Sequence, residues 1–195
     1  MKKVLPFLSL IIICLLLTSC GSSSLKGDLT SYSSADGSFS IELPAEKEDS
    51  WISDSESPEN TLDISNKNDT VNIKVQCLSK NQAGYIAHDL ESYRDYAMVN
   101  ILGDILTESD LNEAEIKPAD FITNSEAYEY SLKDGISGMV MFMESDKCYY
   151  MYFVMAVDKY FGSNEKIFTE SISSLKELTD PDMSKDDTDS SGSDK

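Results

Sequence analysis

The stretch that decides the fold reads "GMVMFMESDKCYYMYFVMAV" and runs from Gly138 to Val157. Its two apolar runs, residues 138–144 and 148–157, are separated only by the polar residues "SDK", which predicts an antiparallel hairpin. The second run is apolar at every position instead of alternating. A strand with one solvated face alternates, so we expect residues 148–157 to form a central strand covered on both faces.

Further strands are predicted on either side of this hairpin. "EAYEYSL" (126–132) precedes the hairpin and is separated from it by the turn "KDGIS". The three strands together form an antiparallel meander. Upstream, "TLDIS" (61–65) and "TVNIKVQCLS" (70–79) flank the polar turn "NKND", and "SFSIEL" (38–43) alternates apolar and polar residues. These segments predict a sheet built mainly from antiparallel neighbours.

Two segments have helical periodicity. In residues 89–103 apolar side chains recur at spacings of three and four, with Asp89 as the expected N-cap and Gly103 as the expected stop. Residues 163–176 repeat the pattern, with Ser163 or Asn164 as cap. Strands, a helix, more strands and a final helix predict a single α+β domain on an antiparallel sheet.

Four segments in this order resemble the PsbP/DcrB-like family. They are "YSSADGSFSIELP" (32–44), "DLESYRDYAM" (89–98), "DFITNSEAYEYSL" (120–132) and "IFTESISSLKEL" (167–178). The resemblance covers residues 31–177 and implies an antiparallel sheet flanked by helices, an α/β/α sandwich. One departure is that Trp51 lies seven residues after Pro44, farther than in many relatives. Plant relatives are accessory subunits of the oxygen-evolving machinery, a role that no residue here supports, and bacterial relatives are often lipid-anchored.

The N-terminus predicts export. Lys2 and Lys3 precede an apolar run of about 14 residues, Val4 to Leu17, which is shorter than the roughly 20 residues of a membrane-spanning helix. "LTSC" at residues 17–20 resembles the lipobox of bacterial lipoproteins. The resemblance implies that residues 1–19 are a signal peptide and that a diacylglyceryl group anchors Cys20 to the extracytoplasmic face of the cell membrane. The alternative is a plain secreted protein with an incidental cysteine.

The ends and the charge of the chain restrict its partners. Residues 20–30 have the small, polar composition of a flexible tether, and residues 178–195 that of a disordered acidic tail. The tail lacks the glycine and the closing glutamate of an EF-hand loop. A formal net charge of −19 argues against binding to nucleic acid and to anionic lipid head groups.

Cys77 and Cys148 are the cysteines that remain beyond Cys20, and both fall in predicted strands. An exported protein can join such a pair in a disulfide, and two buried free thiols are the other alternative. His88 is the single histidine, so a multi-histidine metal site is impossible, and a solvent-facing or capping role is favoured over catalysis. We expect no metal and no cofactor.

Three groups of side chains invite functional hypotheses. The carboxylates are Glu108, Asp110, Glu113 and Glu115; the aromatic residues are Tyr128, Tyr130, Tyr149, Tyr150, Tyr152 and Phe153; the thioethers are Met139, Met141, Met143, Met151 and Met155. A solvated loop is favoured for the first group over a glycosidase pair. Sheet core is favoured for the second over a sugar- or peptide-binding surface, and for the third over a copper site.

Together these features predict a lipid-anchored extracytoplasmic binding or accessory module of the bacterial cell envelope. Its partner would be an envelope protein, peptide or polymer. No nucleophile elbow, phosphate loop or dinucleotide motif is present, so an enzyme is not expected. The alternative is an envelope-acting hydrolase with an unrecognised carboxylate site. A solute receptor is disfavoured because one domain lacks the two lobes that close around a ligand.

Overall fold

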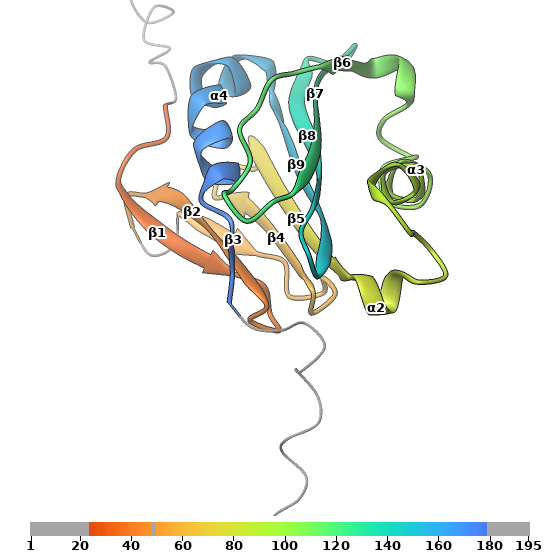
Figure 1. Ribbon diagram of the computed structural model, residues 1–195. Coiled ribbons are helices and arrows are strands. Elements are labelled where there is room, and N and C mark those ends of the chain that lie inside the picture. The colour runs from red at the N-terminus through yellow and green to blue at the C-terminus, as the bar shows by residue number, and fades with distance from the viewer. Residues whose placement is uncertain (1–23, 48–49, 179–195) are drawn as a thin grey trace, which may run out of the picture.

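The computed structural model describes residues 24–47 and 50–178, which form one α+β domain with two antiparallel sheets (Figure 1). The large sheet has the order β3-β4-β5-β9-β8-β7-β6 and the small sheet the order β1-β2-β10. The large sheet comprises β3 (Trp51–Ser53), β4 (Thr61–Asn66), β5 (Val71–Ser79), β6 (Leu111–Glu113), β7 (Asn124–Leu132), β8 (Ile136–Glu144) and β9 (Cys148–Val157). The small sheet comprises β1 (Asp28–Ser33), β2 (Phe39–Ala45) and β10 (Lys176–Glu177). The helices are α2 (Lys80–Ala83), α3 (Leu90–Asn100) and α4 (Asp158–Ser173), with a 3-10 turn, η1 (Glu108–Asp110).

The β9 strand lies at the centre of the large sheet, as its composition predicts. It pairs with β5 on one side and with β8 on the other, both antiparallel. Because neighbouring residues of a strand point to opposite faces, its aromatic side chains serve two cores. Tyr150 and Tyr152 belong to one core, and Tyr149 and Phe153 to the other.

One side of the large sheet, here called the α4 face, packs against α4 and the small sheet. Its core includes Phe39 and Leu43 from β2, Tyr150 from β9, and Phe168 and Ile172 from α4. The first and last described segments of the chain meet in the small sheet, where β10 pairs with β2. This face therefore closes only when both ends of the domain are in place.

The opposite side, here called the α3 face, packs against α2 and α3. Leu90, Tyr93 and Ala97 of α3 lie on Phe142 and Tyr149 of the sheet. Figure 1 shows α3 on the side of the sheet away from α4, connected by segments that run outside the sheet. The prediction of an antiparallel sheet flanked by helices is confirmed, and the small sheet on the α4 face is an addition to it.

Several boundaries differ from those predicted; α3, for example, ends at Asn100 instead of at Gly103. The last helix begins at Asp158 instead of Ser163 or Asn164, because β9 continues directly into it and Tyr160 and Phe161 reach the α4-face core. Residues 28–30, predicted as part of a tether, are the start of β1, where pairing with β2 supplies the backbone hydrogen bonds that composition does not reveal. The predicted signal peptide, Cys20, and residues 179–195 of the predicted tail lie outside the described residues.

Candidate functional site

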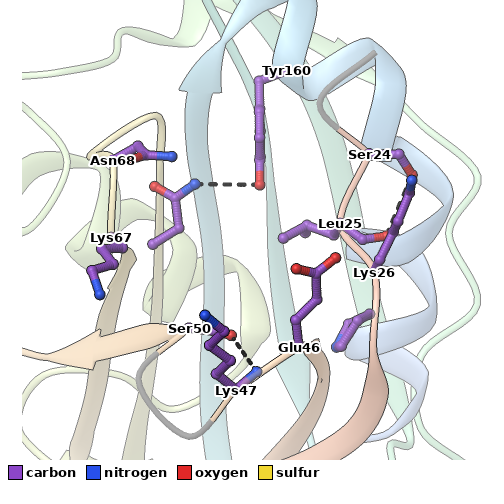
Figure 2. Close-up of a pocket in the computed structure, with 11 residues that line it drawn as sticks. Ser24, Leu25, Lys26, Glu46, Lys47, Ser50, Lys67, Asn68 and Tyr160 are labelled. Carbon is purple, nitrogen blue, oxygen red and sulfur yellow. Dashed lines mark hydrogen bonds between the residues drawn. The ribbon is translucent and has the colours of Figure 1, made fainter. Parts of the chain in front are cut away.

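A pocket of about 350 Å³ lies where the described chain enters the domain; we call it the entry pocket (Figure 2). It is lined by Ser24, Leu25, Lys26, Pro44, Glu46, Lys47, Ser50, Asn66, Lys67, Asn68 and Tyr160. Leu25 fixes the entering segment, because it packs against the α4-face core and its backbone N–H donates to Asn164 Oδ1 at 2.6 Å. The pocket therefore combines an apolar wall with lysines and a carboxylate.

Tyr160 and Asn66 form the polar back of the entry pocket. Asn66 Nδ2 donates to the Tyr160 hydroxyl at 3.3 Å and to Thr70 Oγ1 at 2.8 Å. Burial raises the pKa of Tyr160, and the hydrogen bond with Asn66 opposes that shift. Figure 2 shows the Glu46 carboxylate directed toward Leu25 and Tyr160. The lining of the pocket therefore carries both cationic and anionic side chains.

A second concavity, here called the glutamate groove, lies between the β6–β7 side of the sheet and α4. Its volume is about 720 Å³, and its lining includes Glu113, Glu115, Glu129, Glu165 and Glu170. Burial raises the pKa of Glu129, and the nearby charge of Glu165 adds to the effect. Lys166 is paired with Glu170 at 3.5 Å. The sequence predicted Glu113 and Glu115 as solvated loop residues and missed Glu129 and Glu165, which only the tertiary fold brings together.

The carboxylates of the predicted acidic loop lie in different places. Glu113 and Glu115 line the glutamate groove, whereas Glu108 lines a separate groove beside α3. Asp110 accepts hydrogen bonds from the Thr107 N–H at 2.9 Å and from its hydroxyl at 2.6 Å, and these bonds lower the pKa of Asp110. The four carboxylates therefore do not form one site.

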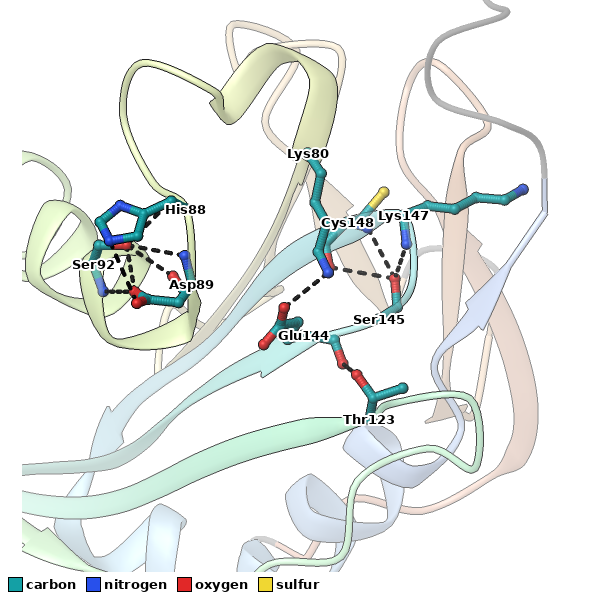
Figure 3. Close-up of polar contacts among 9 residues, drawn as sticks. All are labelled: Lys80, His88, Asp89, Ser92, Thr123, Glu144, Ser145, Lys147 and Cys148. Atoms are coloured by element: carbon teal, nitrogen blue, oxygen red, sulfur yellow. Dashed lines mark hydrogen bonds and ion pairs between the residues drawn. The ribbon is translucent and has the colours of Figure 1, made fainter.

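His88 and Asp89 mark the start of α3 (Figure 3). The His88 ring is exposed, and its Nε2 lies 3.5 Å from Asp89 Oδ2. Asp89 is the N-cap, as predicted, and forms a capping box in which Oδ1 accepts from the Ser92 N–H at 2.9 Å and from its hydroxyl at 2.6 Å. These bonds lower the pKa of Asp89. His88 lies in the solvent-facing position that the sequence favoured.

Cys77 and Cys148 are both buried and free. Their strands are neighbours, but Cys77 lies opposite Tyr150 and Cys148 opposite Ser79, so the two cysteines are diagonal. Diagonal Cα atoms in a ladder are about 7–8 Å apart, longer than the usual span of a disulfide, so bridging would need backbone movement. Hydrogen bonding with Cys148 and burial raise the pKa of Cys77, which keeps this thiol protonated. The disulfide stays a prediction that intact mass can decide.

The aromatic and methionine groups lie mainly in the core. Of the aromatic residues only Tyr128 is half-buried; the others are buried. Met155 is the half-buried member of the methionine group, and the other four are buried. Stacked rings of Tyr130 and Phe153, with centroids 5.7 Å apart, fill the α3 face. These side chains hold the sheet together and do not present a binding surface.

Over residues 24–47 and 50–178, no group of three or more histidine, cysteine, aspartate or glutamate residues is arranged to hold a metal ion. Within the same residues, no helix has both the length and the apolar character needed to cross a membrane.

No protein-family model and no curated protein matches the chain. The chain is similar in structure to cyanobacterial PsbP (CyanoP) from Synechocystis sp. PCC 6803, determined in solution. The TM-score is 0.50 at 15% sequence identity, and the likeness covers 82% of this chain and 97% of the cyanobacterial one. The fold is therefore that of a PsbP-like domain. Trp51 is buried, and its indole N–H donates to the Pro44 carbonyl at 3.0 Å.

Proposed function

We propose that this protein is a binding or accessory module of the bacterial cell envelope, anchored to the extracytoplasmic face of the membrane by a diacylglyceryl group on Cys20. The observation that carries the anchor is the sequence "LTSC" directly after a short apolar run. Two acyl chains hold a protein at a bilayer far more firmly than one, since each buried methylene contributes about 0.8 kcal/mol. The PsbP-like fold supports an accessory or binding role.

The position of Ser24 adds a geometric consequence to the anchor. Ser24 is the first described residue and lines the entry pocket, four residues after Cys20. Four extended residues span at most about 14 Å. With Cys20 acylated, the entry pocket would be held close to the bilayer surface, and the α3 face would be available to other envelope components.

The anchor is tested by Cys20→Ala, with Cys14→Ala as the matched control inside the apolar run. We expect the first variant to leave the membrane fraction and to lose labelling by radioactive palmitate, while the second keeps both. Membrane retention of Cys20→Ala after a carbonate wash would contradict the anchor.

The binding role is tested by crosslinking in intact envelopes. The wild-type chain should give discrete crosslinked products that disappear when Cys20→Ala removes the chain from the membrane. Crosslinking without any discrete product, at a cell density where the chain itself is detected, would contradict a module with a fixed partner.

A hydrolase is the second candidate, and the glutamate groove favours it. Glu129 has a raised pKa next to Glu165, the relation that a general acid needs beside a second carboxylate. Glu129→Gln and Glu165→Gln should each abolish any release of reducing ends from purified cell-wall glycan. Hydrolysis that both variants retain, or its absence from the wild-type chain, would remove this candidate.

A further inference from the structure

The outer side of α3 carries an apolar residue that the fold leaves uncovered. Val99 is 75% exposed, although it stands on a helix whose other side is packed in the core. It follows Ala97 by two positions, so it points away from the face of α3 that packs on the sheet. Only a contact outside the described domain could bury it.

Val99 borders a groove of about 640 Å³ between α3 and the turn that follows it; we call it the α3 groove. Its apolar wall consists of Met98, Val99 and Leu106, and its rim carries Asp95, Asp104 and Glu108. Met98 and Leu106 are buried beneath, so the wall is continuous with the core of the α3 face.

The shape of the groove is set by the backbone. Gly103 lines it, and a Cβ there would lie 2.6 Å from the Val99 carbonyl oxygen, so the turn can approach the helix this closely only with glycine. On the far side, the Thr107–Asp110 hydrogen bonds hold the turn in place. The groove is therefore a built feature of the described domain.

The charges on the rim select the occupant. Asp95 is bonded to Arg94 at 3.0 Å, whereas Asp104 and Glu108 have no cationic partner within the described part of the chain. The whole chain has a formal charge of −19, so a second copy, a polyanion or an anionic lipid surface would be repelled. A cationic segment with an apolar face would be attracted and would cover Val99.

We propose that the α3 groove binds a cationic amphipathic segment of a partner protein, with apolar side chains against Val99 and lysine or arginine beside Asp104 and Glu108. This mode of binding places a segment's apolar face in an apolar groove and its charges at the rim. The inference rests on the proposed binding role and gives the chemistry of the partner.

The test uses two fluorescent helical peptides and the full chain in phosphatidylcholine nanodiscs, with empty nanodiscs as background. The first peptide has leucines at spacings of three and four and lysines elsewhere; the second has glutamate for each lysine. Fluorescence anisotropy should show binding of the first peptide only. The variant Asp104→Lys/Glu108→Lys should weaken that binding by at least about tenfold, and Val99→Gln, which removes the apolar contact without changing the charge, by a similar factor.

The matched control is Asp28→Lys/Glu56→Lys, which changes the net charge equally at two exposed positions that line neither the α3 groove nor the glutamate groove. We expect it to weaken binding by less than about threefold. Equal losses for both double variants would overturn the proposal, because they would reduce it to general charge attraction; so would the absence of binding to the wild-type chain. All these substitutions are at exposed positions, and far-UV circular dichroism verifies folding.

The proposed α3-groove binding and the proposed lipid anchor can be refuted separately. Cys20→Ala should bind the lysine peptide as the wild-type chain does, whether or not the chain enters the nanodisc. Loss of peptide binding in Cys20→Ala would overturn a groove that acts by itself, and membrane retention of that variant contradicts only the anchor.

Discussion

The α4 face of the large sheet is covered by a helix and a second sheet, whereas the α3 face is covered by helices alone. On the α4 face, segments from both ends of the domain meet, and Phe39 and Phe168 are fully buried. On the α3 face, α3 has only 11 residues, and its Val99 is exposed. Tyr85, in the connection between α2 and α3, is exposed as well. The difference indicates that more segments of the chain close the α4 face than the α3 face.

The two faces should also differ in how they unfold. The helical layer on the α3 face is held by one short helix and exposed connections, whereas segments from both ends of the domain pack on the α4 face. We therefore expect the α3 face to open at a lower free energy than the α4 face. Trp51, the only tryptophan, lies in the α4-face core, so its fluorescence reports on that face alone. Circular dichroism of helices reports on both faces, and a comparison of the two signals separates them.

The largest expected effect comes from Phe168→Ala. The Phe168 ring is fully buried and stacks on Phe161 with centroids 5.9 Å apart, so its removal should cost about 3–5 kcal/mol. Because the α4 face supports the whole domain, the unfolding transitions measured by Trp51 fluorescence and by circular dichroism should shift to lower urea together.

The matched variant on the other face is Tyr93→Ala. The Tyr93 ring stacks on the Tyr149 ring, with centroids 5.2 Å apart. Here circular dichroism should change before Trp51 fluorescence, and coincident curves for Tyr93→Ala would contradict separate faces.

A smaller effect distinguishes two buried hydroxyls on the α3 face. The Tyr130 hydroxyl donates to the Val154 carbonyl at 2.7 Å, whereas no described residue bonds the buried Tyr93 hydroxyl. Tyr130→Phe should therefore lower the free energy of unfolding by about 1–2 kcal/mol, and Tyr93→Phe should leave it unchanged or raise it by up to about 1 kcal/mol. Urea unfolding measures both. Equal losses would show that the Tyr93 hydroxyl has a bound partner.

The smallest effect concerns the N-cap of α3 and its dependence on pH. The pKa of Asp89 is lowered by its bonds to Ser92, so the charged cap stabilises α3 above the unfolded pKa, near 3.8, and this contribution is lost as the pH falls through the lowered value. The protection of α3 amides from hydrogen exchange, measured relative to the rate of an unstructured chain at the same pH, should therefore fall at low pH in the wild-type chain. In Asp89→Ala exchange should be faster already at neutral pH, and Asp89→Ser should retain a cap that does not titrate. An unchanged exchange rate in Asp89→Ala would contradict a role of the cap in holding this layer.

Local patterns predicted most of the large sheet but not its edges. Five of its strands are long enough for alternation or continuous apolar character to be read, and the capping box of α3 depends on residues three apart. The edge strands β3 and β6 have three residues each and β10 of the small sheet has two, too few for any period, and all three exist only because a neighbour pairs with them. Likewise, Ser163 and Asn164 are residue types that favour an N-cap, and burial of Tyr160 and Phe161 overrides that local signal.

The candidate sites were less predictable than the fold. The position of Val99, out of phase with the buried residues of its helix, could have been noticed in the sequence. The entry pocket could not, because it joins the start of the domain to Asn66 and Tyr160. The glutamate groove depends in the same way on contacts between a strand and a helix that are distant in the chain.

The sequence by itself determined the features that depend on neighbouring residues: the strands and their alternation, the central place of residues 148–157, the cap at Asp89, and the motif at Cys20 from which the anchor is inferred. Only the tertiary structure decided which residues from distant segments meet. It joined β10 to β2 to close one face, set Cys77 and Cys148 diagonally, and left Val99 uncovered beside Asp104 and Glu108. The physical reason is that periodicity and capping act over a few residues, whereas the pairing of strands and the packing of layers depend on the whole chain.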